Sequence, residues 1–287
     1  MAAPLLLAIL PEPGRLEAAF AVVRDAWGVR HSGMDAAALF FLVLLRFFAI
    51  TQLCPFLGGR LVPGSVKIGL SMVLAWFATP WLSQHLENPL VMNGTRFWLA
   101  AMHELGMGTL IGFGSSLIFF AASMGGEFLD TVRGTLTANL MVPQLQVQTT
   151  LMGDFYFQLF VVLYLLGGGH LFFLSAVFDS LQLFPPTGAF PAAAVVNASF
   201  LKMAVSLFGI MVKVVAPAIL VLVMVDVVLG VANRMSPQLD VFFVGLGLKP
   251  ALGLLMVALS LHALLGAAPE IFLGFEGWLA SWMRHGS

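Results

Sequence analysis

Six long apolar stretches, joined by short polar connections, constrain this chain more than any other feature. They cover residues 36–57, 66–82, 97–122, 155–184, 203–231 and 241–265. Because 60% of the 287 residues are hydrophobic and only 9% are charged, the chain has too few polar side chains to cover a water-soluble globule. The sequence therefore predicts an all-α membrane protein of long helical hairpins, with no room for a soluble catalytic domain.

The lengths of these stretches do not fit a simple bundle. Residues 155–184 would form a straight helix of roughly 45 Å, against a hydrocarbon core of about 30 Å, whereas residues 66–82 are barely long enough to cross. We expect the glycines at 167–169 to bend the former stretch. Pro217 is expected to bend the stretch at 203–231, because it removes a backbone donor from a helix interior. The hairpins are therefore predicted to be partly broken.

The basic residues give no orientation in the membrane. Sorted by connection, six of the 13 Lys and Arg residues fall on one side and five on the other, and two lie inside the stretches. Either the expected boundaries of the apolar stretches are wrong, or neighbouring proteins, and not only the bilayer, hold this chain in position. The net charge of −1 offers no basic surface for nucleic acid and no acidic surface for cations.

Several ionisable residues lie in or beside the apolar stretches, where exposure to lipid is costly. They are Arg46, Glu104, Asp154, Asp179, Lys213 and Asp226. Lys213 and Asp226 are about 20 Å apart along one helix, so they cannot pair with each other. We expect their partners on other helices or other subunits; a proton or ion relay is the functional alternative.

Gly108 and Gly112 form a GxxxG pair that allows two helix backbones to approach closely. We interpret the pair as a helix-packing site, and we expect the nearby Glu104 to bond a neighbouring helix.

Motifs for catalysis or cofactor binding are absent from the sequence. No glycine is followed by Lys and Ser or Thr as in a phosphate loop, and Met107 stands where a zinc-protease helix starting at His103 needs its second histidine. The six histidines are scattered, and the single cysteine, Cys54, is expected to be a small core residue. We therefore predict no enzymatic activity, no catalytic residue, no cofactor and no metal site. Residues 1–35 are interpreted as an amphipathic lead-in and not as a cleaved signal peptide.

Two connections repeat one local sequence. ANLMVPQLQV at residues 138–147 and ANRMSPQLDV at 232–241 agree at seven of ten positions, but the similarity does not extend to the preceding residues. We interpret both as hairpin connections that reached the same local solution, and we favour this over an internal duplication.

Two connections also carry a pattern specific to one family. Residues 55–70 read PFLGGRLVPGSVKIGL and residues 229–249 read LGVANRMSPQLDVFFVGLGLK, with Gly126–Glu127 and Gly169–His170 between them. Over about residues 36–265 the chain resembles the FliR/SctT family, the export-gate subunit shared by bacterial flagella and injectisomes of type III secretion.

The resemblance implies a multi-pass protein of the bacterial inner membrane that helps to form a closed pore for unfolded secreted polypeptides. Its implied partners are P-type and Q-type export-gate subunits, further export-apparatus membrane proteins and membrane lipid, without nucleic acid. Family members look like a P-type and a Q-type subunit fused in one chain. Here this implies a P-type-like part over residues 36–190 and a Q-type-like part over residues 191–287.

The resemblance also implies a pore plug at residues 139–150. The plug candidates are uncharged, so they could not bind a passing polypeptide through ion pairs. They are Met141, Pro143, Gln144, Gln146 and Gln148. Without the family, the segment would be interpreted as a surface turn. The family usually has an acidic residue before the proline, where this chain has Val142.

The subunit-contact candidates are Arg60, Pro63, Lys67, Glu104, Arg234, Pro237, Gln238, Asp240 and Lys249. For Arg60 and Lys67, anchoring to lipid headgroups is the simpler alternative, and Pro63 sets their turn. Arg234 and Asp240 flank Pro237 at a hairpin tip that the family places near the cytoplasmic entrance.

The sequence favours the injectisome branch over the flagellar one, and two other functions are alternatives. Asp130, Arg133 and Gly134 form a DxxRG run that resembles the injectisome branch more than the flagellar one, whereas Gly169–His170 fits both. A secondary transporter for a small solute is the alternative function, motivated by Pro217, the triple glycine and the buried charges. A scaffold that assembles other membrane proteins is a third.

Overall fold

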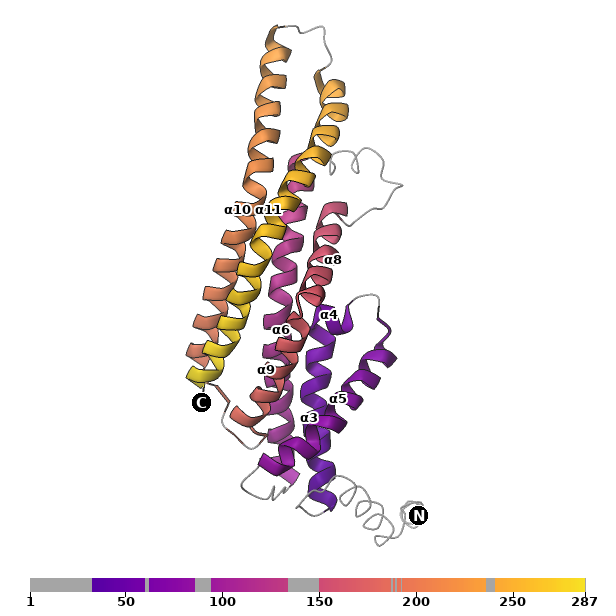
Figure 1. The fold of residues 1–287 in the computed structure, drawn as a ribbon, viewed down its shortest axis with the longest axis vertical. Coiled ribbons are helices and arrows are strands. Elements are labelled where there is room, and N and C mark those ends of the chain that lie inside the picture. The colour runs from indigo at the N-terminus through magenta and orange to yellow at the C-terminus, as the bar shows by residue number, and fades with distance from the viewer. Residues whose placement is uncertain are drawn as a thin grey trace, which may run out of the picture. The chain divides into compact units, whose positions relative to one another are not determined.

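The computed structural model describes residues 33–59, 62–85, 94–133, 150–186, 188, 190–191, 193–235 and 241–286 (Figure 1). Within these ranges every regular element is a helix, which confirms the predicted all-α class. The helices are α3 (Gly33–Leu53), α4 (Pro55–Gly58), α5 (Gly64–His85), α6 (Gly94–Arg133), α8 (Leu151–Leu166), α9 (Gly169–Leu183), α10 (Ala193–Met235) and α11 (Val241–Gly286).

In the described part of the chain, five helices are long and apolar enough to cross a membrane, or six if the bent α8–α9 pair counts as one span. Four helices are longer than the apolar stretches that predicted them: α5 has 22 residues, α6 has 40, α10 has 43 and α11 has 46. These helices were therefore predicted too short. Hydropathy marks only the part of a helix compatible with lipid, whereas backbone hydrogen bonding continues beyond it. Pro217 lies inside α10, which continues through it.

The expected bend at the triple glycine is confirmed. The axes of α8 and α9 meet at 75°. Gly168 has a φ of +75°, a left-handed conformation that favours glycine, and its N–H donates to the carbonyl of Leu165. The ring of Tyr164 occupies the space where a side chain on Gly169 would lie. The glycines therefore supply both the backbone turn and the room for an aromatic ring.

The chain divides into two compact units. The first comprises the described residues of Met1–Gly114, Leu174–Ala192 and Met283–Ser287. In it α3 packs against α5, and Leu39, Leu42 and Val43 of α3 are fully buried. The hydroxyls of Thr51 and Ser71 are 2.7 Å apart, which joins the same two helices through a buried hydrogen bond.

Close packing of α3 against α6 in this unit depends on two glycines. A Cβ on Gly108 would lie 2.5 Å from the carbonyl oxygen of Arg46, and one on Gly112 would lie 3.2 Å from the Cα of Ile50. No side chain fits at the first position without a backbone shift. The predicted GxxxG packing site is therefore confirmed, and its partner helix is α3.

The second unit comprises the described residues of Ser115–Phe173 and Ala193–Trp282. Its core is aromatic. The ring of Phe119 meets the rings of Phe160 and Tyr164 edge-on, with centroids 6.1 and 5.5 Å apart, and Tyr164 also packs edge-on against Phe272. Such edge-to-face contacts give the core specificity beyond simple apolar burial.

Candidate functional site

The strongest polar site of the first unit is an ion pair enclosed among apolar helices. Arg46 of α3 donates from Nε to Glu104 Oε2 at 2.5 Å and from Nη2 to Glu104 Oε1 at 2.7 Å, and both side chains are 0% exposed. Two parallel bonds of this kind match the planar guanidinium to the carboxylate. The structure confirms that Glu104 bonds a neighbouring helix. That helix is α3 of the same chain.

Arg46 also binds the C-terminal end of α9. Its Nη1 donates to the carbonyl of Ser180 at 2.9 Å, and its Nη2 donates to the carbonyl of Phe184 at 2.6 Å. Carbonyls at the end of a helix carry partial negative charge, and that of Ser180 also accepts the backbone N–H of Phe184 at 3.0 Å. One guanidinium therefore neutralises Glu104 and satisfies the end of α9, which makes this network a structural centre. The sequence marked Arg46 and Glu104 as costly in lipid, but it did not indicate the carbonyl of Phe184.

In the second unit, Asp130 and Arg133 at the end of α6 form hydrogen bonds with the backbone of α8 and of α11. Asp130 Oδ2 accepts a hydrogen bond from the backbone N–H of Met152 at 2.9 Å, in the first turn of α8. Arg133 Nη1 lies 3.5 Å from Asp130 Oδ1, and its Nη2 donates to the carbonyl of Pro250 in α11 at 3.3 Å. Asp130 thus satisfies an orphan donor of α8, as an N-cap residue does.

Two glycines bring α6 and α8 together beside this contact. A Cβ on Gly126 would overlap the backbone of Met152, and one on Gly153 would overlap Thr150 and Glu127. Together with Asp130, these contacts join the last turns of α6 to the first turn of α8. We call this arrangement of Gly126, Asp130, Met152 and Gly153 the α6–α8 clasp.

A second ion pair joins α10 and α11. Lys249 and Asp226 are in direct contact, and their side chains are 26% and 44% exposed. The prediction that Asp226 has its partner on another helix is confirmed. Lys249, a subunit-contact candidate, therefore already has a counter-ion within the chain.

The other charged residues of the apolar stretches lie at the surface. Asp154, Asp179 and Lys213 are exposed, and within the described ranges no ion pair involves them. Cys54 is buried, as predicted. Among the residues that the structure describes, no group of three or more His, Cys, Asp or Glu residues could hold a metal ion.

The predicted contact residues are only partly described. Pro63 is exposed, Lys67 is half-buried beside Gly58, and Arg234 is exposed near the end of α10. Four contact candidates lie outside the described residues: Arg60, Pro237, Gln238 and Asp240. The plug candidates Met141, Pro143, Gln144, Gln146 and Gln148 lie outside them as well.

The described residues define a class: a helical, multi-pass membrane protein in which the buried Arg46–Glu104 pair and side chains that bond backbone atoms join helices distant in sequence. Residues 37–274 match the family of bacterial export proteins, family 1, and the chain belongs to this family.

Relatives occur in both flagella and secretion systems. The chain is 28% identical to the flagellar biosynthetic protein FliR of Bacillus subtilis over 84% of this chain and 93% of that protein. It is 28% identical to the secretion system apparatus protein SsaT of Salmonella typhimurium, over 83% of this chain and 93% of that protein. It is also 26% identical to the Yop proteins translocation protein T of Yersinia pestis, over 81% of this chain and 89% of that protein. Similarity therefore does not separate the two branches.

The protein is an integral component of the type III protein export gate and a multi-pass protein of the bacterial inner membrane. It acts among other membrane proteins of an export apparatus, and its family is one of export-apparatus proteins and not of enzymes. The secondary-transporter alternative is not favoured.

Proposed function

We propose that this chain closes the export pore with residues 139–150 and that unfolded polypeptides pass when this segment moves aside. The segment carries no charge over Asn139–Thr150, so it offers a passing polypeptide no ion pair. The chain itself catalyses no reaction, and other subunits supply the energy for export.

The observation that carries this proposal is the α6–α8 clasp at the base of the segment. Asp130 and Met152 lie on the two helices that lead into and out of residues 134–149, and their hydrogen bond is 2.9 Å long. Arg133 anchors the same end of α6 to Pro250 of α11. Fixing both ends of the segment to helices limits how far the residues between them can reach and lowers the entropy cost of holding them in one place.

The proposed partners are P-type and Q-type export-gate subunits. Residues 36–190 would take the place of a P-type subunit, and residues 191–287 that of a Q-type subunit. The tip between α10 and α11 carries Arg234, Pro237, Gln238 and Asp240 and docks against these partners. Arg60, Pro63 and Lys67 would form a further contact, with lipid anchoring as the simpler alternative for the two basic side chains. The DxxRG run supports an injectisome.

Purification in mild detergent tests the partner assignment. We expect the chain to be recovered with P-type and Q-type subunits. A stable isolated monomer, recovered without either partner from cells that express both, would contradict the proposal.

Deletion of Met141–Gln148 tests the plug. We expect the assembled gate to conduct more ions across the membrane than the unaltered gate, because the deletion removes the uncharged residues that close the pore. Ion leakage is measured in cells that express the gate, and recovery of the full complex serves as the control for assembly. Unchanged leakage through a fully assembled gate would remove this segment from the pore.

A further inference from the structure

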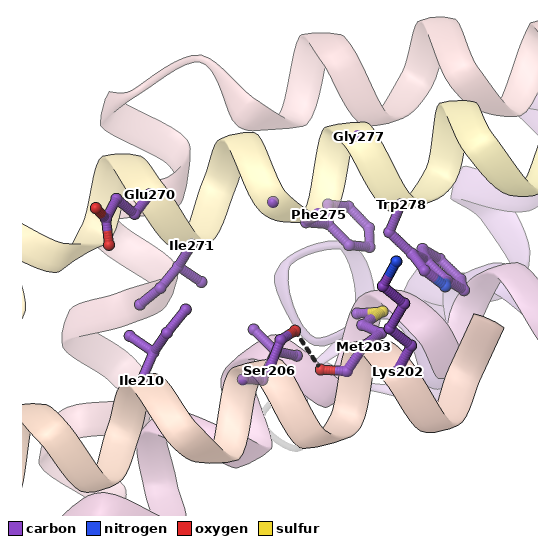
Figure 2. Close-up of a pocket in the computed structure, with 11 residues that line it drawn as sticks. Lys202, Met203, Ser206, Ile210, Glu270, Ile271, Phe275, Gly277 and Trp278 are labelled. Atoms are coloured by element: carbon purple, nitrogen blue, oxygen red, sulfur yellow. Dashed lines mark hydrogen bonds between the residues drawn. The ribbon is translucent and has the colours of Figure 1, made fainter. Parts of the chain in front are cut away.

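A groove of about 350 Å³ lies between α10 and α11 (Figure 2). Its floor is apolar and buried, and the residues that form it are Met203, Leu207, Ile271, Phe275 and Trp278. Its rims are exposed. Lys202 and Ser206 of α10 form one rim, and Glu270, Gly274 and Gly277 of α11 form the other.

Opposite charges lie toward the two ends of the groove. Figure 2 shows Lys202 at the end where Trp278 lies and Glu270 at the end where Ile210 lies. Eight residues separate Glu270 from Trp278, which corresponds to about 12 Å along a helix. Within the described part of the chain, neither Lys202 nor Glu270 forms an ion pair.

Lys202 is exposed at the edge of an apolar span. It lies four residues inside the span Ala198–Met235. A basic side chain at such a position needs either an acidic partner or the membrane surface. The indole of Trp278 donates to the carbonyl of Ser199 at 3.0 Å, so the floor at this end is fixed and the groove is preformed.

We propose that this groove binds one apolar helix of another membrane subunit of the export apparatus. The helix carries an acidic side chain that faces Lys202 and, about two turns away on the same face, a basic or amide side chain that faces Glu270. The inference rests on the proposed function, because it takes its partner from the same apparatus. Since the two charges differ in sign, their order fixes both the register and the direction of the bound helix.

The rims favour a helix over a lipid chain. Nothing lies within 4 Å of the position that a Cβ would occupy on Gly274 or Gly277, so the backbone of α11 is open to a neighbour. Small residues allow helices in membranes to approach closely. An acyl chain bound by its headgroup at Lys202 would run toward the carboxylate of Glu270, which is unfavourable.

Photocrosslinking in intact membranes tests the occupant. A photoreactive amino acid is placed at Gly274 of the full-length chain, and the same amino acid at Gly69, an exposed and open position in α5, is the matched control. We expect the Gly274 probe to crosslink an apolar helix of an export-apparatus subunit, at a site within two turns of an Asp or Glu residue. The proposal would be overturned if the probe crosslinked only phospholipid or only a second copy of this chain. It would also be overturned if no crosslink formed in a fully assembled gate.

Charge reversal tests the assigned chemistry. We expect Lys202→Glu to lower recovery of the assembled complex by at least about tenfold, because it places two acidic side chains together in a partly desolvated groove. Lys202→Arg should retain recovery, and replacing the partner's acidic residue with Lys should restore it in the Lys202→Glu background. Gly274→Leu, which fills the groove, should also lower recovery, whereas Gly69→Leu should not.

The two proposals fail in different ways. If the unaltered chain is recovered without P-type and Q-type subunits, the proposed function fails. If the unaltered complex assembles and both Lys202→Glu and Gly274→Leu assemble equally well, the groove assignment alone is wrong.

Discussion

Two ion pairs that join helices in the described part of the chain, Arg46–Glu104 and Lys249–Asp226, differ in how completely the chain encloses them. Arg46 and Glu104 are 0% exposed, and Arg46 makes further bonds to the end of α9. Lys249 and Asp226 remain 26% and 44% exposed. Burial is tolerated where every charged atom has a partner, whereas an exposed pair contributes little stability and can exchange its partner. The first pair therefore belongs to the folded chain, and the second is available to an assembly.

The largest expected effect is the loss of the buried acid. Glu104→Ala should lower the free energy of unfolding by about 3–5 kcal/mol, because it leaves the guanidinium of Arg46 buried without a counter-ion. Thermal denaturation of the detergent-solubilised protein and its level in membranes measure the loss. Glu127→Gln on the exposed side of α6 is the matched control and should change little. If the two variants were equally stable, the buried pair would have no structural role.

The close approach of α3 and α6 is the next test. Gly108→Ala should destabilise the chain by about 1–3 kcal/mol, because the added Cβ meets the backbone of the residue that carries the buried guanidinium. Gly69→Ala in α5, where the space is open, should be neutral or slightly stabilising. Thermal denaturation compares the two. A neutral Gly108→Ala would mean that α6 can move away from α3 at no cost.

The α6–α8 clasp should lie between the two ion pairs in importance. Asp130→Ala removes the acceptor of the Met152 N–H and should lower the free energy of unfolding by about 0.5–2 kcal/mol, as the loss of a helix cap does. Hydrogen exchange at the start of α8 should rise in this variant and not in Asp179→Ala, whose side chain is exposed on α9. Protection that is unchanged at Met152 would exclude the capping role.

The smallest effect on the isolated chain is expected at the exposed pair. Asp226→Asn and Lys249→Gln should each lower the free energy of unfolding by less than Glu104→Ala does, because this pair is only partly enclosed by the chain, and a double-mutant cycle should give a small coupling. Recovery of the assembled gate should fall more than this stability change explains. If Asp226→Asn or Lys249→Gln lowered stability as much as Glu104→Ala, the Lys249–Asp226 pair would be as important for folding as the Arg46–Glu104 pair, which would contradict this comparison.

Local features were predictable from the sequence. The bend at residues 167–169, the packing role of Gly108 and Gly112, and the partnership of Glu104 and Asp226 with other helices follow from glycine geometry and from the cost of charge in an apolar setting. Each of these rules depends on a few neighbouring residues.

Contacts between distant residues were not predictable. Asp130 and Arg133 looked like a feature of one family branch, yet they bond Met152 and Pro250, which lie 22 and 117 positions away. The partner groups are the backbone N–H of Met152 and the backbone carbonyl of Pro250. Every residue except proline has both groups, so the sequence does not indicate which residue will supply them. The helix ends beyond the apolar stretches were missed for a similar reason, since backbone hydrogen bonds continue whatever the hydropathy.

The 75° bend between α8 and α9 has a consequence for how this protein enters the membrane. With 16 and 15 residues, the two helices extend only about 24 and 22 Å, so neither reaches across a hydrocarbon core of about 30 Å. The backbone groups at Gly167 and Gly168 need a protein environment in place of lipid. The insertion machinery therefore cannot release this pair into the bilayer as an independent unit. Because α3 and α6 precede the pair in the chain, and Arg46 of α3 binds carbonyls at the end of α9, we expect the pair to enter the membrane by packing against helices that are already there.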